Sequence, residues 1–246
     1  MLNTFVIALR EGLEASLIVG ILIAYLKKAQ RESLLKSLWF GVFSAIGAAL
    51  LFGGFLSFTS TNLSEEGEMI FAGTTGTIAV GLVTWMIFWM KKTARFMKLE
   101  LEQKASAAIS AGALSLAAFT AVAREGLETS LFLYANFKAG GNAAASTIGL
   151  ILGIGASVAL GYAIYKGAIR FNLALFFKFS GVALILVAAN VFKMSLGEYV
   201  ELGYLSPESL PTIAALAYIA ISMPLYLSKP KPVTPAELKN RITLAK

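Results

Sequence analysis

The 246-residue sequence contains no cysteine, no histidine and no aspartate. The first two absences exclude disulfides, zinc fingers and thiolate chemistry. Charge is also scarce: charged residues make up 14% of the chain, against about 25% in a typical soluble domain. Hydrophobic residues make up 57%. The polar surface that a water-soluble globule needs is missing, so we expect lipid to cover much of this molecule.

Seven apolar segments are each long enough to cross about 30 Å of hydrocarbon as a helix. The sequence therefore predicts an all-α membrane protein with seven transmembrane helices. It forms a single transmembrane domain over residues 1–228, followed by a cytoplasmic tail at 229–246. The predicted spans are Asn3–Leu26, Leu34–Phe58, Met69–Met90, Ala107–Phe137, Ala143–Tyr165, Ala174–Met194 and Leu210–Leu227.

The charges between these segments alternate along the chain. Basic residues follow the first, third, fifth and seventh spans, whereas glutamates dominate the linkers after the second and the sixth. Because basic loops stay in the cytoplasm, the N-terminus is predicted outside and the C-terminus inside. Trp85 and Trp89, near the basic end of the third span, are interpreted as part of an aromatic belt. Membrane orientation accounts for the net charge of +7, and we expect no nucleic-acid binding.

Two segments repeat one another almost completely. Residues 10–17 read REGLEASL and residues 124–131 read REGLETSL, with seven of eight positions identical. Weaker matches continue at an offset of 108 residues, and they predict a first repeat over about 1–92, a second over about 106–196, and a seventh helix at about 210–227. The two motif helices begin on opposite sides of the membrane. Such inverted repeats are typical of secondary transporters, whose substrate site lies near the bilayer midplane.

Each motif places one arginine and two glutamates within an apolar helix, where each ionisable group costs about 2.5–3.5 kcal/mol. The arginine and the second glutamate are four residues apart and can pair along one helix face. Four ionised carboxylates and two guanidinium groups sum to two negative charges, which a bound cation would neutralise. Carboxylate oxygens are hard ligands and favour hard cations. Structural ion pairing alone explains one glutamate per motif and not the second. Proton or organic-solute transport stays as an alternative.

At Arg10–Glu14 and Arg124–Glu128 the chain resembles the oxidase-dependent high-affinity iron permeases, which include the bacterial ferrous/ferric iron permease subunit. Members of that family have seven membrane helices and an Arg-Glu-x-x-Glu motif in the first and fourth. The resemblance implies a metal site whose carboxylates Arg10 and Arg124 organise. Its implied iron ligands are Glu11, Glu14, Glu125 and Glu128. It also implies an external capture element, which Glu198 and Glu201 match, with Glu65, Glu66 and Glu68 as further acids.

The expected function is high-affinity transport of iron ions, Fe2+ or Fe3+, across the plasma (inner) membrane into the cytoplasm. No cofactor is expected beyond the transported iron, and the resemblance implies an extracytoplasmic oxidase or iron-binding protein as partner. Manganese or lead stays as an alternative cargo. A membrane-embedded glutamate-dependent enzyme is a weaker alternative, because an enzyme needs carboxylates in different environments and this sequence repeats one environment twice.

Overall fold

The computed structural model describes residues 1–93, 110–138, 142–168 and 172–228. Within these ranges the chain forms seven α-helices and no strand, which confirms the all-helical prediction. The predicted start of the fourth span at Ala107, the start of the second repeat at 106 and the tail at 229–246 lie outside the described residues. The helices are α1 (Leu2–Lys28), α2 (Leu35–Thr61), α3 (Glu65–Thr93), α5 (Ala111–Lys138), α6 (Ala143–Tyr165), α7 (Leu173–Glu201) and α8 (Leu210–Leu227).

Several helices extend beyond the apolar runs that predicted them. The third begins at Glu65 rather than Met69, and the sixth predicted span, α7, continues to Glu201 rather than ending at Met194. The apolar run ends at the first cluster of charges, whereas the helix continues. The bilayer is about 30 Å thick in hydrocarbon but about 40–45 Å with its headgroups, so charged terminal turns can remain helical in the polar layer.

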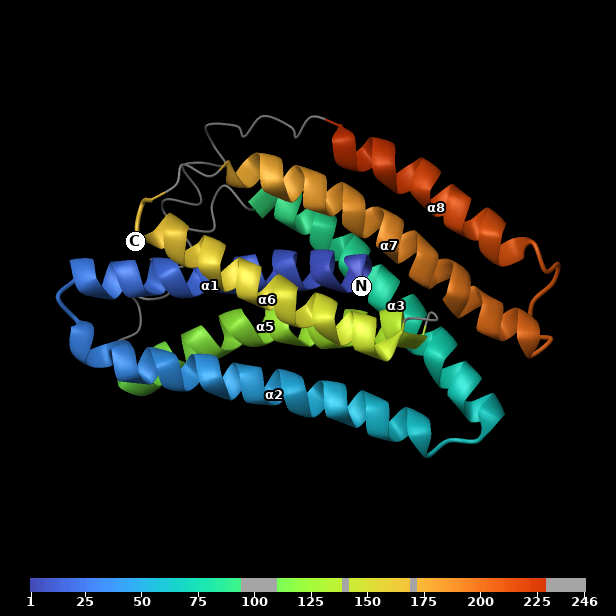
Figure 1. The fold of residues 1–246 in the computed structure, drawn as a ribbon, viewed down its shortest axis with the longest axis horizontal. Coiled ribbons are helices and arrows are strands. Elements are labelled where there is room, and N and C mark those ends of the chain that lie inside the picture. Colours follow the sequence, from blue (N-terminus) through green and yellow to red (C-terminus); the bar gives the residue numbers. More distant parts are fainter. Residues whose placement is uncertain (94–109, 139–141, 169–171, 229–246) are drawn as a thin grey trace.

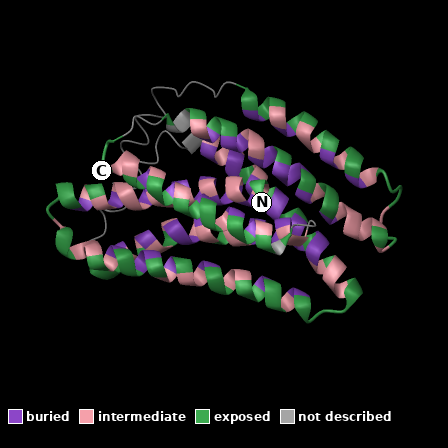
Figure 2. Ribbon diagram, in the orientation of Figure 1, coloured by how far each residue is buried: buried purple, intermediate pink, exposed green. Residues whose placement is uncertain are grey.

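Five helices are long and apolar enough to cross a membrane by length and composition alone: α2, α3, α6, α7 and α8. The other two, α1 and α5, carry the repeated charged motifs. Large apolar side chains on the outside of the bundle, such as Phe40, Leu51 and Phe58 of α2, are well exposed. Figure 2 shows exposed positions recurring along α2 and α8. A surface of this kind is suited to contact with lipid.

The two motif helices, α1 and α5, each pack against a helix that is distant in the sequence. The neighbour of α1 is chiefly α6, and the neighbour of α2 is chiefly α5. A Cβ atom on Gly12 would meet Ser157, and one on Gly161 would meet Ser16, so α1 and α6 run parallel. Small residues at such contacts let two helix backbones approach closely in a membrane.

The helices α3, α7 and α8 form the other side of the bundle (Figure 1). Helix α3 packs against α7, and α7 packs against α8. A large apolar cluster joins these helices to α5 and to Ile7 of α1. The two motif helices also contact one another. The motifs therefore lie in the interior of the bundle, between the α2 and α6 side and the α3 and α7 side.

Candidate metal site

The first motif is almost completely withdrawn from solvent. Arg10, Glu11 and Glu14 are 2%, 3% and 0% exposed. The Arg10 guanidinium bridges both carboxylates: its Nη1 donates to Glu11 Oε1 at 2.6 Å, and its Nη2 lies 3.0 Å from Glu14 Oε1. Charged groups buried in this way need partners. Arg10 supplies one positive charge for two carboxylates, so negative charge remains on this helix when both are ionised.

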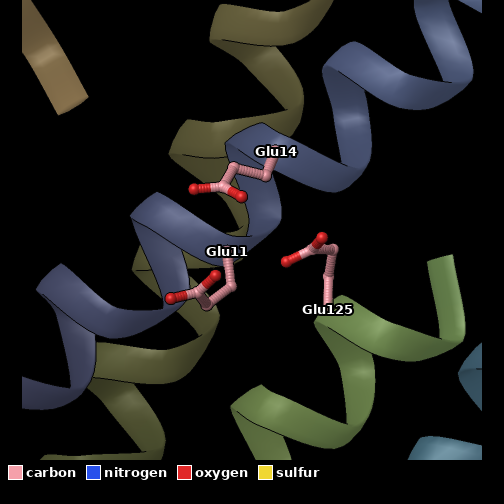
Figure 3. A group of neighbouring side chains, drawn as sticks. All are labelled: Glu11, Glu14 and Glu125. Carbon is pink, nitrogen blue, oxygen red and sulfur yellow. The ribbon is translucent and has the colours of Figure 1, made fainter. Parts of the chain in front are cut away.

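The second motif contributes Glu125, which is also buried. Ligand oxygens of Glu11, Glu14 and Glu125 all lie within 4.8 Å of one another. Figure 3 shows Glu125 of α5 directed toward the two carboxylates of α1. Two helices whose motifs are more than one hundred residues apart in sequence therefore bring three carboxylates to one point. If all are ionised, three negative charges face the single positive charge of Arg10.

Unpaired oxygens mark the interior of this carboxylate group. Glu11 Oε2, Glu14 Oε2 and Glu125 Oε2 are buried, with no hydrogen-bond partner among the described residues. A buried acceptor that loses water without gaining a donor is destabilising by about 1–3 kcal/mol, and more when charged. Carboxylate oxygens that together carry excess negative charge are suitable ligands for a cation such as iron, manganese or magnesium. The arrangement is chemically suited to holding a cation.

Glu128 occupies a different environment from the other three. It pairs with Arg124, whose Nε lies 2.9 Å from Glu128 Oε1, and the two side chains are 29% and 16% exposed. The Arg124 guanidinium also lies over the Trp89 ring, 4.3 Å from its centroid. The sequence pattern predicted four equivalent carboxylates. The structure brings three together and leaves the fourth beside them in an ion pair of its own.

Two residues of α3 contact the motif arginines, a role that no sequence motif indicated. Met86 is fully buried with its Sδ 3.0 Å from Arg10 Nη1. Trp89, interpreted from sequence as part of an aromatic belt, covers Arg124, whereas Trp85 is 59% exposed. Both contacts depend on how α3 crosses the bundle, and no local pattern in the sequence encodes that crossing.

The predicted external acids gather at one end of the bundle, around the start of α3 and the end of α7. Glu68 pairs with Lys138 at the end of α5, and Tyr204 donates its phenolic O–H to Glu66 at 3.2 Å. Glu198 lies within electrostatic reach of Glu68, Lys138 and its helix neighbour Glu201. Of the acids in this group, Glu65, Glu66 and Glu201 are exposed.

The hydrogen bond and the negative charge of Glu66 raise the pKa of Tyr204 above its ordinary value, because both favour the protonated phenol. The acidic end therefore contains at least one hydrogen bond whose presence depends on pH.

The chain is similar in sequence to known proteins of one family. The model of the iron permease FTR1 family matches residues 1–206. Ferrous iron permease EfeU of Escherichia coli O157:H7 is 38% identical over 208 residues, covering 82% of this chain and 75% of that protein. Ferrous iron permease EfeU of Yersinia pestis is 36% identical over 208 residues, covering 82% and 73%. No solved structure matches the chain. The chain belongs to the iron permease FTR1 family, and it is a multi-pass plasma-membrane iron transporter rather than an enzyme.

Proposed function

We propose that this permease moves iron ions into the cytoplasm through a carboxylate site formed by Glu11, Glu14 and Glu125. The observation that carries the proposal is the meeting of three buried carboxylates within 4.8 Å inside an apolar bundle. Their unpaired oxygens lack hydrogen-bond donors and their negative charge exceeds the positive charge nearby. A bound cation would compensate both. The relatives named ferrous iron permease support iron as the cargo.

We further propose that Glu128 becomes a fourth ligand during transport. It lies one helical turn from Glu125 on α5, and its Oε2 is buried without a hydrogen-bond partner among the described residues. Its other oxygen is paired with Arg124. A small displacement of α5 that brings Glu128 inward would exchange this ion pair for contact with the cation. The unequal burial of the two motifs then represents one state of the transport cycle.

The chain is proposed to be an inverted repeat, residues 1–92 and 106–196, with the N-terminus outside and the C-terminus in the cytoplasm. Equivalent positions make equivalent contacts, which supports this arrangement: Gly12 faces Ser157 of α6, and Gly126 faces Ala49 of α2. In such transporters one bundle of helices rocks against another around a site near the bilayer midplane, and here each of the two most closely packed pairs of helices takes one helix from each repeat. The α1–α6 and α2–α5 pairs are the units that would move.

The acidic end of the bundle is proposed to face outward and to collect the cation. Its members are Glu65, Glu66, Glu68, Glu198 and Glu201. An interior-negative membrane potential then favours inward movement by about 2.3 kcal/mol per charge per 100 mV. A separate extracytoplasmic oxidase or iron-binding protein would deliver iron to this surface.

Radiolabelled iron uptake into proteoliposomes tests the site. Glu11→Gln and Glu125→Gln keep the side-chain size and remove the charge, and we expect either to reduce uptake to background. Glu208→Gln, on an exposed loop outside both acidic groups, is the matched control and should transport like wild type. Ferrous and ferric iron are supplied separately, with manganese as competitor. Full uptake by the two site variants would overturn the carboxylate site, and wild-type uptake of manganese without iron would overturn the cargo.

A further inference from the structure

Among the described residues, Met86 is the one methionine whose sulfur atom has a polar contact with a charged residue of the two motifs. It lies on α3, is 0% exposed, and its Sδ accepts a hydrogen bond from Arg10 Nη1 at 3.0 Å. The same Nη1 donates to Glu11 Oε1 at 2.6 Å. One guanidinium nitrogen therefore lies between a carboxylate of α1 and a thioether of α3.

The position of Arg10 Nη1 indicates where a cation can bind. A cationic nitrogen is already held there by lone pairs from Glu11 and Met86. When Nη1 withdraws, those lone pairs face the vacated position, together with the unpaired Oε2 of Glu14. The other guanidinium nitrogen, Nη2, keeps its contact with Glu14 Oε1. Arg10 can therefore yield this position to a metal ion while it keeps its ion pair with Glu14.

A thioether changes which metal ion the site prefers. Carboxylate oxygens suit hard cations such as Mn2+, whereas a thioether sulfur is a soft ligand. Ferrous iron is softer than ferric iron, and Fe2+ lies above Mn2+ in the general order of site affinity. We propose that Met86 Sδ is a ligand of the transported ion and gives the carboxylate site its preference for ferrous iron over harder cations. This inference rests on the proposed carboxylate site and extends it to the oxidation state of the cargo, and it favours an iron-binding protein over an oxidase as the extracytoplasmic partner.

Met90 provides a matched comparison on the same helix. It lies one turn from Met86, is 3% exposed, and packs in the same apolar cluster. Within the described part of the chain it makes no polar contact to either motif. Exchange of a buried methionine for leucine conserves volume and is usually well tolerated. If Met86 served packing alone, the two leucine variants would behave alike.

X-ray absorption spectroscopy at the iron edge tests ligation directly. The protein, in lipid nanodiscs, is loaded with Fe2+ under ascorbate, which contains no sulfur. Because the chain has no cysteine, a sulfur neighbour of iron has to be methionine. We expect a sulfur shell in wild type and in Met90→Leu, and its loss in Met86→Leu. Iron surrounded by oxygen and nitrogen alone in wild type, or a sulfur shell that persists in Met86→Leu, would overturn the assignment.

Uptake selectivity provides a second measurement. In proteoliposomes we expect Met86→Leu to lower the ratio of Fe2+ to Mn2+ uptake by about tenfold or more, and Met90→Leu to keep the wild-type ratio. Met86→Gln, which offers an amide oxygen at similar reach, should shift the ratio further toward Mn2+. An unchanged ratio in Met86→Leu would refute the role of Met86 and leave the carboxylate site standing. Wild type that transports no iron would instead refute the proposed function itself.

Discussion

Arg10 and Glu14 form an ion pair of 3.0 Å whose side chains are 2% and 0% exposed. The equivalent pair in the second motif, Arg124 and Glu128, is 2.9 Å long with side chains 29% and 16% exposed. The two pairs share sequence spacing and geometry and differ in their access to solvent. Removing one partner leaves an unpaired charge, and the cost of that charge rises with its burial.

The first prediction compares the two arginines. Arg10→Gln should lower the free energy of unfolding by about 3–5 kcal/mol, as expected when one partner of a buried pair is removed. Arg124→Gln should cost less than Arg10→Gln, because the Glu128 side chain left behind is 16% exposed rather than fully buried. Chemical denaturation in detergent micelles measures both, with Lys36→Gln on the exposed start of α2 as the control. If the two arginine variants lost equal amounts of unfolding free energy, the difference in burial would not determine how much each ion pair contributes to stability.

The second prediction concerns the contact between α1 and α6. A Cβ atom on Gly12 would clash with the Ser157 side chain, so Gly12→Ala should destabilise the protein by about 1–3 kcal/mol through overpacking. Adding Ser157→Gly removes the clashing atoms and should restore most of the loss. Gly47→Ala, where nothing lies within 4 Å, should be neutral or slightly stabilising. Thermal unfolding checks all three, and a double variant no better than Gly12→Ala would place the strain elsewhere.

The third prediction concerns ligand binding without transport. Iron at about one hundred times its dissociation constant should stabilise the folded protein by roughly 2.7 kcal/mol, because the unfolded chain lacks the assembled site. The melting temperature should rise on adding Fe2+ and fall again on adding a chelator. Glu125→Gln should lose this response while Glu208→Gln keeps it. An iron-dependent shift of equal size in Glu125→Gln would remove this residue from the site.

The fourth prediction concerns pH at the acidic end. Tyr204 donates to Glu66, which raises the pKa of the phenol above its ordinary value of about 10. The bond therefore stabilises the folded loop below that ordinary value and is lost as pH rises through the raised pKa. Nuclear magnetic resonance of ring-labelled tyrosine, assigned with Tyr204→Phe, follows the titration. Glu66→Gln removes the charge and should lower the Tyr204 pKa toward its ordinary value; an unmoved titration would show that Glu66 is not its cause.

Much of the fold was predictable because lipid imposes a simple rule on the sequence. An apolar run of sufficient length has to be a helix in a bilayer, so the seven α-helices within the described ranges were located from composition. Helix ends were less predictable: α7 continues to Glu201 because a helix does not end where apolar residues end. Nor does local sequence predict the pairing of α1 with α6, since it depends on shape-matched small residues such as Gly12 and Ser157.

The candidate site was predictable in composition and less so in geometry. Charged residues inside an apolar helix are expensive, and that cost drew attention to Glu11, Glu14 and Glu125. The repeated motif predicted equal roles for Glu14 and Glu128, yet only the first joins the carboxylate group. Identical sequences can sit in unequal environments, because the surrounding helices differ. The contact of Met86 with Arg10 was not predicted, because 76 residues separate the two in sequence.

The pairing of α1 with α6 has a consequence for biosynthesis. A ribosome adds about 5–20 residues per second, so α1 is made roughly ten seconds before the helix it packs against. For much of that delay, until α5 is made, the buried charges of α1 lack Glu125, and the insertion machinery or a provisional contact has to separate them from lipid. The first half of the chain cannot complete its structure alone, since α2 waits for α5 in the same way. Assembly therefore becomes cooperative only after most of the polypeptide has been translated.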